Sequence, residues 1–144
     1  MQRLYLFLSF LIFHTVFSQD YYVYVAAESD DQVSVLKFDG KEIIETDRIS
    51  VGIMPTENEG PHGITIDPSG KYWYLTLAHG SPNGSVVKYS TENNEPLSKV
   101  ELGLFPATIQ ISKKTGLLYV VNFNLHGLMT VSYTHLTLPT SYPV

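Results

Sequence analysis

A twenty-residue stretch, PHGITIDPSGKYWYLTLAHG from Pro61 to Gly80, most constrains what this chain can fold into. Apolar and polar residues alternate before the segment DPSG at 67–70 and alternate again after it. Alternation with a period of two on both sides of a Pro/Gly turn predicts a β-hairpin with one buried face. Asp67 is interpreted as a turn residue, because a short carboxylate accepts hydrogen bonds from the amides that follow it.

The hairpin pattern returns along the chain, which indicates a repeat. Tyr24, Tyr74 and Tyr119 occupy one position of this repeat, 50 and then 45 residues apart. Four short strands in a period of about 40–50 residues are typical of a propeller blade. One such sheet cannot bury both of its faces alone, so neighbouring sheets must cover one another. The sequence therefore predicts an all-β fold, a β-propeller fragment of about two and a half four-stranded antiparallel blades.

The beginning of the chain is interpreted as a secretory signal peptide over residues 1–18. Arg3 precedes an almost unbroken apolar run, and small residues stand before Gln19. The alternative is an uncleaved membrane anchor, but the apolar run is shorter than the roughly 20 residues that span a bilayer. We expect a secreted or periplasmic protein with no membrane partner after signal cleavage.

The end of the chain, residues 131–144, is interpreted as a sequence that is not natural. VSYTHLTLPT at 131–140 matches the translation of a transposase-based sequencing adapter, whose later bases also encode the final Val and a stop. An ordinary C-terminal strand is the alternative. The prediction assigns residues 19–130 to the N-terminal blades of a propeller that continues beyond this sequence.

Composition excludes some classes of function. The chain has nine Lys and Arg against 14 Asp and Glu, a net charge of −5, whereas nucleic-acid binding needs clustered Lys and Arg. We therefore expect no nucleic-acid partner. The chain has no Cys, so disulfides and thiolate metal sites are excluded within this fragment, and its stability must come from packing.

Three segments resemble a known family: PHG at 61–63, DPSGKY at 67–72 and LYVVN at 118–122 are similar to YVTN-type (YncE-like) β-propellers. This group includes the quinoprotein amine dehydrogenase heavy subunit, the haem domain of cytochrome cd1 and the propeller lactonases. The resemblance covers roughly Tyr21 to Thr130. It implies a full protein of seven blades that is exported and acts as a binding scaffold. It also implies that some relatives bind metal or haem, or hydrolyse lactones.

Three histidines, each followed by Gly, are the candidate site residues: His62, His79 and His126. Imidazole is a common ligand of copper and zinc, so these residues are candidate ligands of either metal. The alternative is that each His-Gly pair is a turn in which Gly supplies a positive φ and His is exposed. The loop Glu57–Glu59 is interpreted as a solvated insertion, with a rim contact surface as the alternative.

The resulting hypothesis is a binding or scaffold module for an unknown protein or small-molecule ligand. Specificity would be set by loops at the channel mouth, as in other scaffolds on which function is grafted. The alternative is a propeller enzyme or redox subunit: a lactonase-like hydrolase, or a copper- or haem-linked oxidoreductase that uses channel histidines. The sequence identifies no catalytic residue.

Overall fold

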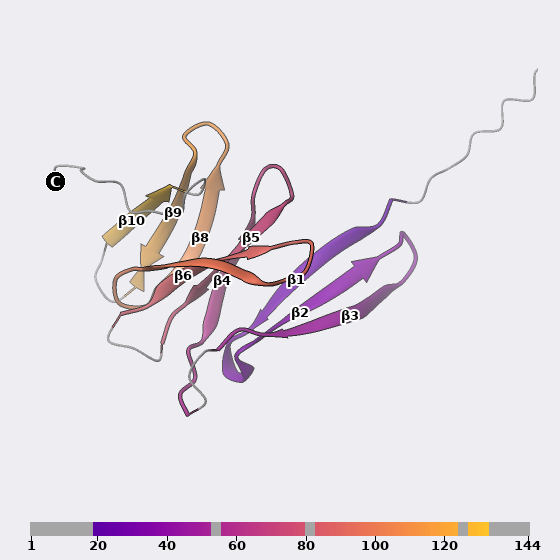
Figure 1. Ribbon diagram of the computed structural model, residues 1–144, viewed down its shortest axis with the longest axis horizontal. Coiled ribbons are helices and arrows are strands. Elements are labelled where there is room, and N and C mark those ends of the chain that lie inside the picture. The colour runs from indigo at the N-terminus through magenta and orange to yellow at the C-terminus, as the bar shows by residue number, and fades with distance from the viewer. Residues whose placement is uncertain (1–18, 53–55, 80–82, 124–126, 133–144) are drawn as a thin grey trace, which may run out of the picture.

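The computed structural model describes residues 19–52, 56–79, 83–123 and 127–132, and these ranges form strands connected by turns (Figure 1). The strands are β1 (Tyr21–Ala27), β2 (Gln32–Phe38), β3 (Ile43–Ser50), β4 (Pro61–Ile66), β5 (Tyr72–Leu77), β6 (Ser85–Ser90), β7 (Pro96–Glu101), β8 (Pro106–Ser112), β9 (Leu117–Asn122) and β10 (Gly127–Ser132). A short 3₁₀ helix, η1 (Glu28–Asp30), joins β1 to β2. Among the described residues no helix is long and apolar enough to cross a membrane.

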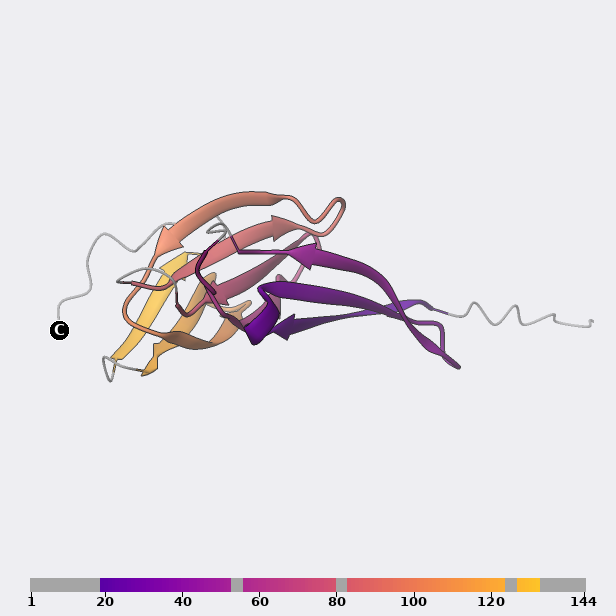
Figure 2. The same cartoon turned by 90° about the horizontal axis from the view of Figure 1, so that it is seen from below.

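The strands form three antiparallel sheets in the orders β1-β2-β3, β4-β5-β6-β7 and β8-β9-β10. We call these sheets blades 1, 2 and 3. Figures 1 and 2 show them side by side, with faces toward one another. The three repeated tyrosines lie on β1, β5 and β9, one in each sheet. The predicted all-β, blade-like organisation is therefore confirmed.

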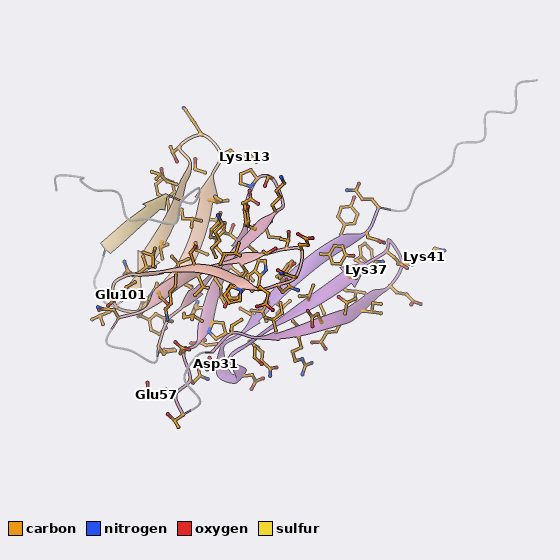
Figure 3. All side chains as sticks on the ribbon, viewed as in Figure 1. Asp31, Lys37, Lys41, Glu57, Glu101 and Lys113 are labelled. Atoms are coloured by element: carbon orange, nitrogen blue, oxygen red, sulfur yellow. The ribbon has the colours of Figure 1, made fainter. Side chains whose placement is uncertain are left out.

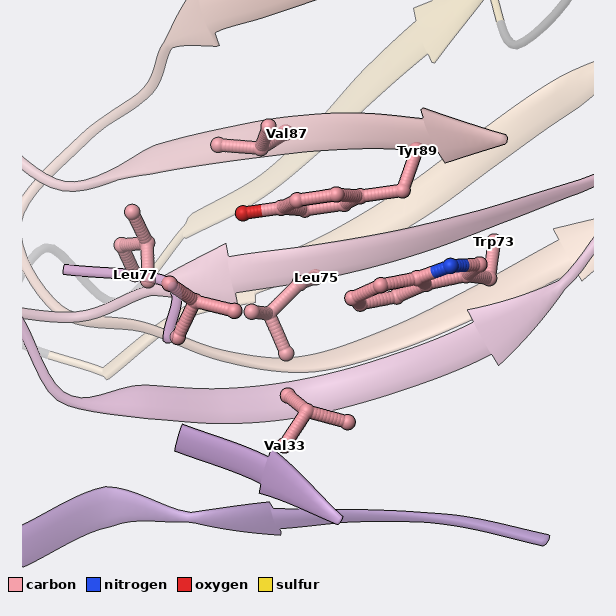
Figure 4. Packing of buried hydrophobic residues seen from close by; sticks show 7 residues of the cluster. Val33, Trp73, Leu75, Leu77, Val87 and Tyr89 are labelled. Carbon is pink, nitrogen blue, oxygen red and sulfur yellow. The ribbon is translucent and has the colours of Figure 1, made fainter. Parts of the chain in front are cut away.

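Blade 2 is buried on both faces, which is what a propeller requires of a sheet that has a neighbour on each side. Along β5, Trp73, Leu75 and Leu77 face blade 1, whereas Tyr74 faces blade 3. The first inter-blade core contains Val33, Val51, Trp73, Leu75, Leu77, Val87 and Tyr89 (Figure 4). The second inter-blade core contains Tyr74, Val86, Leu102, Ile109, Leu118 and Val120.

Aromatic rings join blade 1 to blade 2. Trp73 stacks on Tyr89 with ring centroids 4.0 Å apart and planes 8° from parallel. Tyr24 of β1 approaches Trp73 at 5.3 Å. The side-chain oxygen of Asn94 accepts hydrogen bonds from the Trp73 indole N–H at 3.3 Å and the Tyr24 hydroxyl at 3.5 Å. Large flat side chains with satisfied polar tips therefore fix how these two sheets pack.

Asp67 organises the β4–β5 turn as predicted. Its Oδ1 accepts the backbone N–H groups of Lys71 at 2.9 Å and Tyr72 at 3.0 Å, and its Oδ2 accepts that of Ser69 at 3.0 Å. Burial raises the pKa of this carboxyl, but the hydrogen bonds together outweigh burial and hold the pKa below its ordinary value.

The two terminal interpretations fall largely outside the described residues. Residues 1–18, interpreted as a signal peptide, and residues 133–144 of the segment attributed to the adapter are not described. Val131 and Ser132 are the last residues of β10, where they pair with Leu118 and Leu117 of β9.

The two ends of the sheets differ in charge. We call the end at which β4 and β8 begin the mouth; its described connections are residues 28–31, 51–52, 56–60, 78–79, 83–84, 102–105 and 123. These connections carry Glu28, Asp30, Asp31, Glu57 and Glu59, and none of their residues is Lys or Arg. The turns at the opposite end carry both signs of charge: Lys41, Lys71, Lys113 and Lys114 with Asp39, Glu42, Asp67, Glu92 and Glu95. Figure 3 shows Asp31 and Glu57 at one end, and Lys41 and Lys113 at the other.

Candidate functional site

Two of the three predicted histidines meet at the mouth around a carboxylate that the sequence analysis did not single out. His62 is the second residue of β4, and His79 follows the end of β5. Glu28 reaches them from η1 of blade 1: its Oε1 lies 3.1 Å from His79 Nε2 and its Oε2 lies 4.0 Å from His62 Nε2. We call these three residues the His-Glu cluster. All three side chains are between about a third and a half exposed, so a ligand can reach them.

The interpretation of each His-Gly pair as a turn fails for His62. Gly63 lies within β4 and does not have a positive φ. A Cβ at this position would lie 2.4 Å from the carbonyl oxygen of Ala107 in β8. Gly63 is therefore required by the close approach of two neighbouring strands, which places His62 where blades 2 and 3 converge.

The connection that precedes β4 holds the backbone of Ala78 and His79 through two hydrogen bonds. The N–H of His79 donates to the carbonyl of Glu59 at 2.8 Å, and the N–H of Ala78 donates to that of Gly60 at 2.9 Å. Gly60 has a φ of +61°, and a Cβ there would lie 2.2 Å from His79 Cδ2. Gly60 thus provides both a left-handed turn and the space that the imidazole occupies.

Asp31 holds the same connection from blade 1. Its Oδ2 accepts the N–H of Glu59 at 3.0 Å and its Oδ1 accepts the N–H of Gly60 at 2.8 Å. Glu28 and Asp31 belong to one short connection, so blade 1 contacts His79 through the imidazole and supports its backbone partners as well. This connection is the physical link between blade 1 and the site.

The interpretation of Glu57–Glu59 as a solvated insertion is wrong for Glu59. This residue is 5% exposed, and its Oε1 lies 3.7 Å from Lys99 Nζ on β7. Both of its backbone groups are also used, by Asp31 and by His79. The loop is buried at this residue because it connects two blades, which a local pattern of polar residues does not reveal.

Blade 3 contributes an aromatic side to the site. The Phe105 ring meets the His79 ring edge-on at 4.8 Å and 76°, and the His62 ring at 5.5 Å and 69°. The ring centroid of Phe123 lies 5.7 Å from that of Phe105, and Phe123 is 69% exposed. Phe105 has a φ of 53°, which is an outlier for a bulky residue, and it also precedes Pro106. Such backbone conformations concentrate at functional sites.

The described residues do not by themselves form a metal site. No group of three or more His, Asp or Glu within the described ranges has an arrangement that could hold a metal ion. His79 Nε2 is at hydrogen-bond distance from Glu28 rather than free for a ligand bond. His126 lies outside the described residues, so the copper or zinc ligation by His62, His79 and His126 stays a prediction.

Sequence reasoning missed Glu28, Asp31 and Phe105. The first two stand in a segment, ESDD, that looks like an ordinary polar turn, and η1 replaces that turn in the structure. A signal for Phe105 was present in the repeat. Pro106 aligns with Pro61, so Phe105 aligns with Gly60, and a bulky residue at a glycine position indicates a special role.

Comparison with known proteins places the chain in a family. Residues 13–133 match the family described as "Lactonase, 7-bladed beta-propeller". A search of the curated proteins finds no match to the sequence.

Similar solved structures include the hydrazine synthase of Kuenenia stuttgartiensis, at 21% identity and a TM-score of 0.67, covering 81% of this chain and 32% of that chain. They also include a 6-phosphogluconolactonase-like protein of Bacteroides uniformis ATCC 8492, at 16% identity and a TM-score of 0.62, covering 81% of this chain and 34% of that chain. The chain therefore spans about a third of the length of the solved structures that it resembles. At these identities the structures support the fold alone. On the family match, this chain belongs to the seven-bladed β-propeller lactonase family.

Proposed function

We propose that the full-length protein binds a small cyclic ester at the mouth and hydrolyses it, with His79 and Glu28 acting together as a general base. The observation that carries the proposal is the 3.1 Å contact between His79 Nε2 and Glu28 Oε1, made across the boundary between two blades. The lactonase family of the chain supports the choice of substrate.

The chemistry follows from the pairing of a carboxylate with an imidazole. Glu28 accepts the Nε2–H of neutral His79, which leaves Nδ1 as the proton acceptor of the ring. A water molecule attacks the lactone carbonyl carbon while Nδ1 removes its proton. The ring C–O bond then breaks, and the proton passes from His79 to the departing alkoxide, so the product is the open hydroxy acid. Glu28 stabilises the transient imidazolium, and positioned bases of this kind contribute roughly 10²–10⁴-fold.

His62 has a supporting role in this scheme. Its Nε2 lies 4.0 Å from the second oxygen of Glu28, so the imidazole is beside the reacting pair without taking the proton-accepting position. From there it can donate a hydrogen bond to the ester oxygens of a bound lactone. This role predicts a smaller loss of activity for His62→Gln than for His79→Gln.

The test is lactone hydrolysis by the full-length protein. A pH-stat measures the acid that is released, and the spontaneous rate is subtracted. We expect His79→Gln and Glu28→Gln each to lower kcat/KM by about 10²-fold, within the range for general bases. Glu42→Gln, at the opposite end of blade 1, is the matched control and should retain activity. Hydrolysis that is no faster than the spontaneous rate, or full activity in His79→Gln, would contradict the proposal.

Two other functions would give different results in the same preparation. A non-catalytic binding module would show saturable binding of a lactone by calorimetry without turnover. A redox or metal-dependent protein would carry stoichiometric copper or zinc that is lost in His62→Ala. The partly exposed His-Glu cluster with an aromatic side supports the first of these as the second candidate.

A further inference from the structure

We propose that the ligand of this site is an uncharged lactone with an apolar ring or chain beside its ester, and that Phe105 selects this class. The inference rests on the proposed function for its reaction. It is carried by three observations: the contacts of Phe105, its place in the repeat, and the charge of the mouth.

The contacts place an apolar surface directly beside the reacting groups. The Phe105 ring touches the rings of His79 and His62 at centroid distances of 4.8 and 5.5 Å, and Phe123 extends the surface at 5.7 Å. A lactone whose carbonyl carbon is within reach of His79 can therefore place its neighbouring substituent against Phe105. An apolar substituent loses contact with water there, which favours binding, whereas a hydroxyl loses its hydrogen bonds.

The place of Phe105 in the repeat indicates that the backbone conformation at this position does not itself require an aromatic ring. Gly60 and Phe105 each precede the proline that opens a strand, and both are left-handed, with φ of 61° and 53°. Blade 2 meets this geometry with glycine, which adopts it freely, whereas blade 3 meets it with a residue for which it is unfavourable. Phe105 belongs to neither inter-blade core and is only partly buried. We infer that the ring is present for a ligand rather than for packing.

The charge of the mouth disfavours an anionic ligand. Glu28, Asp30, Asp31 and Glu57 lie on connections at the mouth, the end of the sheets that also carries the site. Carboxylates on one rim create a negative potential that lowers the local concentration of phosphorylated or carboxylated molecules. A phosphorylated sugar lactone would meet this potential and would place its hydroxyls against Phe105.

The test compares three lactones with the full-length protein: dihydrocoumarin, which is apolar; glucono-δ-lactone, which is neutral and polar; and its 6-phosphate. We expect kcat/KM to be highest for dihydrocoumarin, by about tenfold or more over glucono-δ-lactone, and lowest for the phosphate. Phe105→Gly should raise KM for dihydrocoumarin about tenfold, lower the preference for dihydrocoumarin over glucono-δ-lactone by about the same factor, and leave the melting temperature unchanged or higher. The control is Phe38→Ala, which removes an exposed aromatic at the end of β2 away from the mouth and should keep the preference for dihydrocoumarin.

The outcomes separate this inference from the proposed function. Preference for the phosphorylated lactone, or an equal loss for all three lactones in Phe105→Gly, would overturn the inference while leaving lactone hydrolysis in place. If none of the lactones is hydrolysed, the proposed function fails. Saturation-transfer NMR then measures binding alone, and a preference for dihydrocoumarin that disappears in Phe105→Gly would still support the inference.

Discussion

Asp31 is the residue through which blade 1 supports the site, and replacing it with Asn tests that support. The substitution keeps the size of the side chain, and Asn tolerates the left-handed φ of 49° at this position. It replaces one carboxylate oxygen with an NH₂ group, which cannot accept the N–H of Glu59 or Gly60. One backbone donor therefore loses its acceptor and faces another donor.

The magnitude follows from the burial of the donors. Glu59 is 5% exposed and Gly60 is buried, so water cannot fully replace the lost acceptor. An unsatisfied buried donor costs about 1–3 kcal/mol, and the remaining bond loses its charge assistance. We expect Asp31→Asn to lower the free energy of unfolding by about 2 kcal/mol. Urea unfolding of the full-length protein measures this, and hydrogen exchange should show faster exchange at the amides of Glu59 and Gly60.

Asp39 supplies the matched control. Its Oδ1 accepts the N–H groups of Lys41 and Glu42, each at 2.9 Å, in an exposed turn at the other end of blade 1. Water can satisfy those donors, so Asp39→Asn should cost less than about 1 kcal/mol. If Asp31→Asn destabilises the protein no more than Asp39→Asn does, burial of the Asp31 contacts is not what holds the connection, and the reasoning is refuted.

Two further predictions concern the site and the core. Gly60→Ala should lower lactone hydrolysis at least tenfold, because the added Cβ would displace His79. Gly70→Ala is the control: its φ is 71° and no atom lies within 4 Å of the added Cβ, so it should show only the backbone cost of about 1–2 kcal/mol. Equal activities in the two variants would contradict this prediction. Burial, and then the charge of Glu59, raise the pKa of Tyr89 to about 12, above its unfolded value of roughly 10, so this tyrosine stabilises the fold below pH 10 and loses that contribution as the pH rises toward 12. Urea unfolding between pH 9 and 12 should show a loss of about 2–3 kcal/mol that is absent in Tyr89→Phe, and identical profiles would exclude the effect.

The fold was predictable because its signals are local. Trp73 and Leu75 alternate with Tyr74 and Thr76, which predicted a hairpin with one buried face; the structure buries both faces, because a neighbouring sheet covers each one. The turn at Asp67 is determined by residues two to five positions away. The recurrence of Tyr at the same position of each hairpin then indicated separate sheets rather than one continuous sheet.

The site was predictable only in part. The sequence singled out His62 and His79, and the structure places both at the mouth. The partners of these histidines could not be chosen from the sequence. Glu28 is 51 residues from His79, in a different blade, and Phe105 is in a third. Their meeting depends on the angles at which sheets pack, which no local pattern encodes.

The amino-acid sequence by itself therefore determined the strands, the turns and the need for sheets to cover one another, because alternation and turn chemistry act between near neighbours. Only the tertiary structure decided that Glu28, His79 and Phe105 share one rim, that Glu59 is buried, and that Gly63 allows β4 and β8 to approach closely. These facts arise from side-chain contacts between blades, and such contacts exist only once the sheets have packed.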